Sequence, residues 1–90
     1  MALSPHFTNR FEKDVKRTQK RNKDLSKLKA VMDLLINEKP LTVKYQDHIL
    51  VGNYAGAREC HIEPDWLLIY VVDNQSITFT RTGTHSDLFK

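Results

Sequence analysis

The sequence predicts a small α+β domain in which two N-terminal helices pack on a small antiparallel sheet of three to four strands. Apolar residues recur at helical spacing up to about residue 36, whereas from residue 40 onward they alternate or run continuously, as they do in strands. Two helices followed by a set of strands is the pattern of an α+β fold. The 90 residues predict one domain, spanning 1–90, around one core.

The first predicted helix begins near the N-terminus. Ser4 followed by a proline is a typical N-cap and first-turn pair. Phe7, Phe11 and Val15 then recur every four residues, which places them on one helical face. We therefore expect a helix that ends at about residue 21.

The second predicted helix follows a short polar break. Asp24 is its expected N-cap, and the helix is expected to end near Asn37, before a proline. Its apolar positions form a wide stripe, as a helix packed on a core requires. This stripe consists of Leu25, Leu28, Val31, Met32, Leu35 and Ile36.

Four stretches in the second half have the patterns of strands. The longest apolar run, Trp66 to Val72, is typical of a central strand that is covered on both faces. Asp73 and Asn74 predict a tight turn after it, and residues 52–56 predict a loop. The predicted strands comprise residues 48–51, 58–62, 66–72 and 77–81.

Composition excludes several classes of protein. At 40% apolar and 28% charged residues, the chain has an ordinary globular composition, unlike that of a disordered segment. Its apolar runs are too short to span a bilayer, and its first residues lack the core of a signal peptide. The single cysteine, Cys60, excludes an internal disulfide and a cysteine-cluster zinc site. We expect a reduced, cytoplasmic protein without a membrane partner.

Positive charge is concentrated in the N-terminal third. Nine of the fourteen Lys and Arg residues lie between Arg10 and Lys29, together with three acidic residues. From Ala30 onward the chain has five bases and eight acids. This asymmetry suggests a polyanionic partner, although a solvated, lysine-rich helix face would have the same charges.

The C-terminal segment RTGTHSDLF (81–89) contains an unusual set of chemical groups. Arg81 is permanently charged, His85 has an imidazole, the side chain best suited to transfer protons, and Phe89 offers an aromatic ring. Because the segment follows an alternating strand pattern, we expect it to be attached to the sheet. An arginine and a histidine at a sheet edge are suited to a phosphate group.

Other chemistries are disfavoured. His61 and Asp65 are four residues apart, but an intervening proline argues against a helix that would align them on a metal. Strand alternation places Cys60 and His61 on opposite faces, which favours a small buried residue over a nucleophile. The glycines lack the Lys-Ser/Thr pair of a phosphate-binding loop. The remaining possibilities are metal-free acid–base chemistry on a phosphate, or no chemistry at all.

RNA cleavage fits these residues. The ribose 2′-OH is the nucleophile, so a protein needs only a proton acceptor, a proton donor and a cation such as Arg81. Trp66 and Phe89 are candidates to stack on unpaired bases, with core packing and a C-terminal anchor as the respective alternatives. The candidates for proton transfer are His48, His61, Asp65 and His85.

Four segments together resemble the YafQ branch of the RelE/ParE toxin superfamily. They are FEKDVKR (11–17), YQDHILVGNYAGAREC (45–60), HIEPDWLLIY (61–70) and RTGTHSDLF (81–89), and the similarity covers nearly the whole chain. The resemblance implies a toxin of a type II toxin–antitoxin pair that is neutralised by a cognate antitoxin. It also implies a ribosome-dependent endoribonuclease that cuts translated mRNA in the ribosomal A site without a metal or other cofactor.

The resemblance further implies a role for each site residue. His85 would be the principal proton-transfer residue, giving a proton to the 5′ leaving oxygen, and Arg81 would stabilise the scissile phosphate. His48, His61 and Asp65 would orient or deprotonate the 2′-OH, and Trp66 and Phe89 would complete the site. The family usually has a proline after the first histidine, where this chain has Ile49, which puts the role of His48 in doubt.

For such a nuclease, the N-terminal charge is suited to docking on ribosomal RNA. We call the six residues Lys13, Lys16, Arg17, Lys20, Arg21 and Lys23 the basic cluster. The alternative is a non-enzymatic superfamily member that inhibits DNA gyrase or binds RNA without cleaving it. A pure binder has no need to assemble the set that favours the nuclease, which consists of His61, Asp65, Arg81 and His85.

Overall fold

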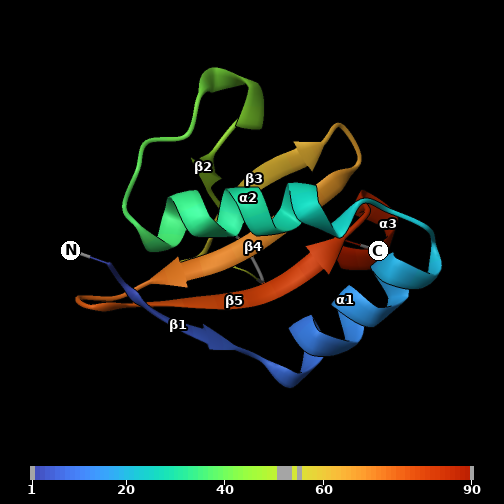
Figure 1. Cartoon of the computed structure of the whole chain (residues 1–90), viewed down its shortest axis with the longest axis horizontal. Coiled ribbons are helices and arrows are strands. Elements are labelled where there is room, and N and C mark those ends of the chain that lie inside the picture. Colours follow the sequence, from blue (N-terminus) through green and yellow to red (C-terminus); the bar gives the residue numbers. More distant parts are fainter. Residues whose placement is uncertain (1, 51–53, 55, 90) are drawn as a thin grey trace.

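Figure 1 shows the computed structural model, which describes residues 2–50, 54 and 56–89. Within these residues, five strands form one sheet in the order β1-β5-β4-β3-β2. The predicted α+β class is confirmed, and no described helix is long and apolar enough to cross a membrane. The strands are β1 (Ser4–Phe7), β2 (His48–Ile49), β3 (Arg58–Glu63), β4 (Trp66–Val72) and β5 (Ser76–Gly83). The helices are α1 (Asn9–Lys20), α2 (Leu25–Ile36), the 3-10 turn η1 (Val43–Tyr45) and α3 (His85–Leu88).

The predicted start of the first helix is wrong. Residues 4–7 form the edge strand β1, which pairs in parallel with β5. The N-cap of α1 is Thr8 instead of Ser4: its Oγ1 accepts from the Phe11 N–H at 3.0 Å and donates to the Thr80 carbonyl at 2.7 Å. Pairing with β5 overrides the local helical pattern, and a proline is tolerated at a sheet edge. The sheet therefore has one strand more than predicted, and that strand is parallel.

The second helix is confirmed. α2 covers residues 25–36 and is capped by Asp24, whose Oδ1 accepts from the Ser26 N–H at 3.0 Å. Figure 1 shows α2 lying across the sheet. Its Leu28 and Val31 are buried against side chains of β3, β4 and β5, so the predicted stripe is the helical half of the core.

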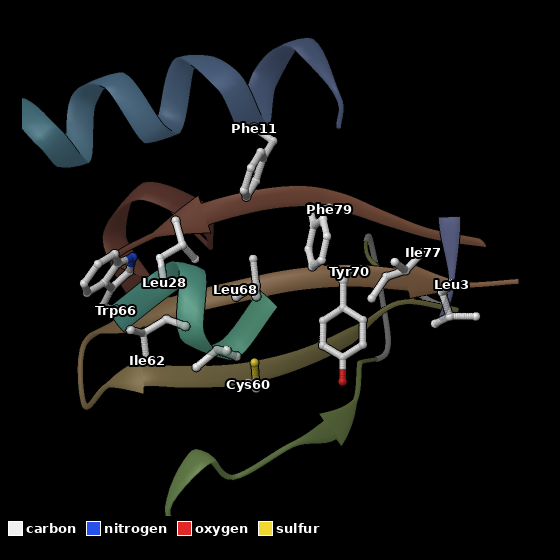
Figure 2. Close-up of a cluster of buried hydrophobic side chains, with 11 residues drawn as sticks. Leu3, Phe11, Leu28, Cys60, Ile62, Trp66, Leu68, Tyr70, Ile77 and Phe79 are labelled. Atoms are coloured by element: carbon white, nitrogen blue, oxygen red, sulfur yellow. The ribbon is translucent and has the colours of Figure 1, made fainter. Parts of the chain in front are cut away.

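β4 is the central strand, as predicted. Its first five residues are buried, and alternate positions face opposite sides. Trp66, Leu68 and Tyr70 join the core beneath α2, which Figure 2 shows, and we call this side the α2 face. Leu67 and Ile69 pack with Leu88 of α3 on the other side, which we call the α3 face.

Strand register places three polar side chains, those of His48, Glu59 and His61, on the α3 face. β2 pairs with β3 through His48 and Glu59, and Glu59 and His61 lie opposite Ile69 and Leu67 of β4. Residues directly opposite each other in a sheet share a face. Of the predicted strand 48–51 and loop 52–56, Val51, Gly52, Asn53 and Ala55 lie outside the described residues.

A bulge in β5 brings Arg81 to the same face. Phe79 lies opposite Tyr70 on the α2 face, so strict alternation would also direct Arg81 into that core. The register shifts between Ile69 and Tyr70, and Arg81 lies opposite Ile69 on the α3 face. Such bulges re-aim side chains at the cost of one unpaired residue.

Candidate active site

His85 is presented by the short helix α3, which begins where β5 ends. Thr84 caps this helix: its Oγ1 accepts from the Asp87 N–H at 3.1 Å. The Asp87 Oδ2 accepts from the Thr84 N–H at 2.9 Å, which completes a capping box. Reciprocal bonds of this kind satisfy the first donors of the helix and fix the direction in which its first residue, His85, points.

Asp65 holds the imidazole of His85. One carboxylate oxygen, Oδ1, accepts from the His85 backbone N–H at 2.9 Å and lies 2.6 Å from ring Nδ1. These bonds lower the pKa of the Asp65 carboxyl below its ordinary value. An ionised Asp65 keeps the proton on Nδ1, so Nε2 is the ring nitrogen available for proton transfer.

His61 and Phe89 flank His85 on the α3 face. The His61 and His85 ring centroids are 5.8 Å apart, and those of His85 and Phe89 are 6.4 Å apart. Tyr54 packs edge-on against Phe89 at 5.5 Å, and its hydroxyl donates to the Leu88 carbonyl. Phe89 is 44% exposed, so the ring is both anchored at one edge and accessible to solvent.

Glu59 is a site residue that sequence reasoning missed. Its carboxylate is buried, with 6% of the side chain exposed, and its Oε1 lies 3.0 Å from His48 Nε2 and 3.9 Å from His61 Nε2. One buried carboxylate thus connects histidines from two strands. Strand alternation places Glu59 on the same face as His61, and this was the sequence signal that could have identified it. Its contact with His48 depends on the pairing of β2 with β3.

Arg81 is not the open phosphate fork expected from the sequence. Its Nε and Nη2 bond to Oδ2 and Oδ1 of Asp14 at 2.7 and 3.2 Å, and 9% of its side chain is exposed. Bonding to Asp14 raises the pKa of Arg81. Asp14 also accepts from the Thr82 N–H at 3.2 Å. Arg81 lines a hollow of about 200 Å³ together with Tyr54 and Thr80.

Trp66 belongs to the core. It is 2% exposed, and its Nε1 donates to Thr82 Oγ1 at 3.0 Å. The structure therefore supports core packing, the alternative to base stacking, for this residue. Cys60 is fully buried, and burial raises the pKa of its thiol to about 12, as expected for an inert small residue.

The basic cluster divides into two groups. Arg17, Arg21 and Lys23 form ion pairs within the protein, with Asp14, Asp87 and Glu63 respectively, at 2.7–2.9 Å. In the part of the chain that the structure describes, the other three members form no ion pair, and all are exposed. These free members are Lys13, Lys16 and Lys20.

The proton-transfer groups lie in an open setting. The side chains of His85 and Asp65 are 54% and 64% exposed. A hollow of about 500 Å³ lies between α2, η1 and the end of β3, and His61 lines it, whereas His85 and Asp65 do not. No three His, Cys, Asp or Glu side chains among the described residues are arranged to hold a metal ion. Sequence-predicted His48, His61, Asp65 and His85 are thus brought together on an exposed face.

Comparison with known proteins gives a consistent result. The family model for the bacterial toxin of type II toxin–antitoxin systems, YafQ, matches residues 3–90. The mRNA interferase toxin YafQ of Escherichia coli K12 is 50% identical over 84 residues, which are 92% of this chain and 91% of that protein. The toxin in the crystal structure of the E. coli DinJ–YafQ toxin–antitoxin complex is 46% identical, with a TM-score of 0.93 over both whole chains. A metal-bound toxin from Helicobacter pylori is 39% identical, with a TM-score of 0.90 over 97% of this chain and 99% of that one.

Proposed function

This chain belongs to the YafQ family of bacterial toxins of type II toxin–antitoxin systems, and we propose that it is an mRNA interferase that cuts translated mRNA in the ribosomal A site. A cognate antitoxin would neutralise it, as the DinJ–YafQ complex suggests. The observation that carries the nuclease proposal is the pair of adjacent imidazoles, His61 and His85, with Asp65 bonded to the second. A pure binding protein has no need of that arrangement.

In the proposed reaction the RNA cleaves itself with help from the protein. A base removes the proton of the 2′-OH, O2′ attacks phosphorus, and the bond from phosphorus to O5′ breaks. His85 Nε2 gives a proton to O5′, so the products are a 2′,3′-cyclic phosphate and a 5′-hydroxyl. His61 is the proposed base, and Glu59 stabilises the imidazolium that forms when it accepts the proton.

Three residues would support this reaction without moving the protons themselves. Asp65 would orient His85 instead of touching the 2′-OH, because its carboxylate already bonds that ring. His48, paired with Glu59, would help to orient the ribose. Arg81 would reach a phosphate oxygen through Nη1, since Asp14 takes its other donors, and the accessible ring of Phe89 would stack on a base.

The open site supports dependence on the ribosome. The side chain of the proposed proton donor, His85, is 54% exposed, so the site neither encloses its substrate nor excludes water, and another surface has to hold the RNA in line for attack. The ribosomal A site would supply that surface, and the free lysines of α1 would dock on ribosomal RNA. No step needs a metal, because the nucleophile is part of the substrate.

The experiment is cleavage of mRNA bound to programmed ribosomes by protein stripped of transition metals. We expect one dominant cut with a 2′,3′-cyclic phosphate on the upstream fragment. The rate should be unchanged by added Zn²⁺ or Cu²⁺. A cut that appears only after metal addition would refute the metal-free mechanism, which the metal-bound relative makes a necessary check.

Replacing the free lysines should weaken docking without altering the chemistry. We expect the triple variant Lys13→Gln, Lys16→Gln, Lys20→Gln to bind ribosomes less tightly, with a smaller dependence of log affinity on log salt concentration. Each lost phosphate contact should reduce that slope by about one. Ribosome binding measured from low to high salt checks this.

The matched control removes three other exposed lysines, Lys29, Lys39 and Lys44. It lowers the net charge by the same amount but leaves α1 unchanged. If the two triple variants bind ribosomes equally well, general charge rather than a docking surface explains the basic N-terminal third.

A further inference from the structure

A chain of ion pairs runs from α1 to both parts of the candidate site. Arg21 bonds to Asp87 at 2.7 Å, and the same carboxylate lies 3.7 Å from Arg17. Arg17 bonds to Asp14 at 2.8 Å, and Asp14 bonds to Arg81 at 2.7 Å. We call these five residues the ionic chain. The ionic chain connects α1 through Asp87 to α3, which presents His85, and through Asp14 to Arg81 of β5.

Asp87 links the ionic chain to the cap of α3. While its Oδ2 accepts from Arg21, it also accepts from the Thr84 N–H at 2.9 Å. α3 has only four residues, too few to be stable without outside contacts. The direction of His85 therefore depends on the bonds at the ends of α3.

Gly83 shows how closely these groups approach. Its φ is +155°, and a Cβ at this position would lie 2.8 Å from Asp87 Oδ2 and 3.2 Å from Arg17 Nη2. A side chain here would displace the pair. Because Gly83 has no side chain, the polypeptide can pass from β5 to α3 while Asp87 of α3 stays close to Arg17 of α1.

We propose that Asp87 is a positioning residue that, through Arg21 and Arg17, fixes α3 against α1 and thereby aims His85. The inference rests on the proposed function of His85. It assigns the two arginines of the basic cluster to the architecture of the site rather than to RNA docking. Asp87 itself touches neither the substrate nor the His85 ring.

Stability alone does not account for these pairs. The Arg21 and Arg17 side chains are 44% and 37% exposed, and ion pairs at such exposure contribute only about 0–1 kcal/mol to folding. Reaction rate is more sensitive than stability to position, because a displacement of about 1 Å can cost up to about 100-fold in rate. The expected signature is a slow enzyme that is still folded.

The test uses Asp87→Asn, Arg21→Gln and the control Lys29→Gln. Asparagine keeps one oxygen as an acceptor for the Thr84 N–H, removes the negative charge and replaces the other oxygen with an NH₂ donor. We expect Asp87→Asn and Arg21→Gln to lower the single-turnover rate at saturating ribosome concentration about tenfold, with KM nearly unchanged. Lys29→Gln removes one exposed charge from α2, outside the ionic chain and the docking lysines, and should leave both that rate and KM unchanged.

Two further variants separate positioning from folding. Arg21→Lys keeps the charge and should recover most of the rate. The double variant Arg21→Gln, Asp87→Asn should be about as slow as either single one, because both changes break the same bond. Thermal unfolding of each variant confirms that it is folded, and the exposed position of Arg21 keeps the test valid if Asp87→Asn does not fold.

The outcomes are distinguishable. If the wild-type protein cuts ribosome-bound mRNA and Asp87→Asn and Arg21→Gln cut it at the same rate, the inference is overturned and the proposed function stays intact. A wild-type protein that does not cut ribosome-bound mRNA would instead refute the proposed function. If Arg21→Gln raises KM without lowering the single-turnover rate, Arg21 contributes to RNA docking and does not position His85.

Discussion

His85→Ala is expected to abolish most cleavage, lowering the single-turnover rate on ribosome-bound mRNA by about 10²–10⁴-fold. Asp65 lies 2.6 Å from Nδ1 and orients the imidazole, and 54% of the His85 side chain is exposed. His61 is 5.8 Å away by ring centroid and, as the proposed base, takes the proton of the 2′-OH, so it does not replace the lost donor. Ribosome affinity should be unchanged, because the lysines of α1 are intact.

His6→Ala is the matched control. His6 is exposed on β1, where it pairs with Thr78, outside the candidate site. This variant should cut at the wild-type rate. If His85→Ala also cuts at the wild-type rate, His85 does not transfer a proton in the reaction.

Asp14→Ala should be the most destabilising single change in the site, lowering the free energy of unfolding by about 3–5 kcal/mol. Asp14 is 3% exposed and accepts from Arg81, Arg17 and the Thr82 N–H. Its removal leaves the guanidinium of Arg81 buried without its partner. Urea denaturation of the wild type and the variant measures the difference.

Two comparisons make this prediction specific. Glu12→Ala removes an exposed carboxylate from the same helix and should change the free energy of unfolding by less than about 0.5 kcal/mol. Asp14→Leu combined with Arg81→Met replaces the ion pair with apolar groups and should recover much of the stability, though not the activity. A loss below about 1 kcal/mol in Asp14→Ala would show that Arg81 finds other partners.

Local patterns were sufficient for α2 and β4. The cap at Asp24 and the apolar stripe of α2 are determined within twelve residues, and the continuous run of β4 shows that both of its faces are covered. β1 could not be predicted in this way. Phe7 and Phe11 have helical spacing, and their rings do stack at 5.8 Å, but Phe7 reaches that contact from a strand paired with distant β5.

The candidate site was predictable where its members occur in short motifs. His61, Asp65 and His85 stand out because histidines and a carboxylate occur close together in motifs. Glu59 and Asp14 resemble ordinary solvated acids until strand pairing and the docking of α1 bury them. The position of Arg81 depends on a bulge in β5. The ion pairs that Arg17 and Arg21 form with Asp87 depend on α3 lying beside α1. These are long-range facts that no sequence window contains.

The most direct test of the central claim is to map RNA ends in cells that produce the toxin, on one message and on its copy without a start codon. We predict discrete cuts in the translated message, none in the untranslated copy, and none in either with His85→Ala. Equal cutting of both messages would contradict dependence on the ribosome. Growth arrest with both messages intact would contradict the nuclease itself and favour the non-enzymatic alternative.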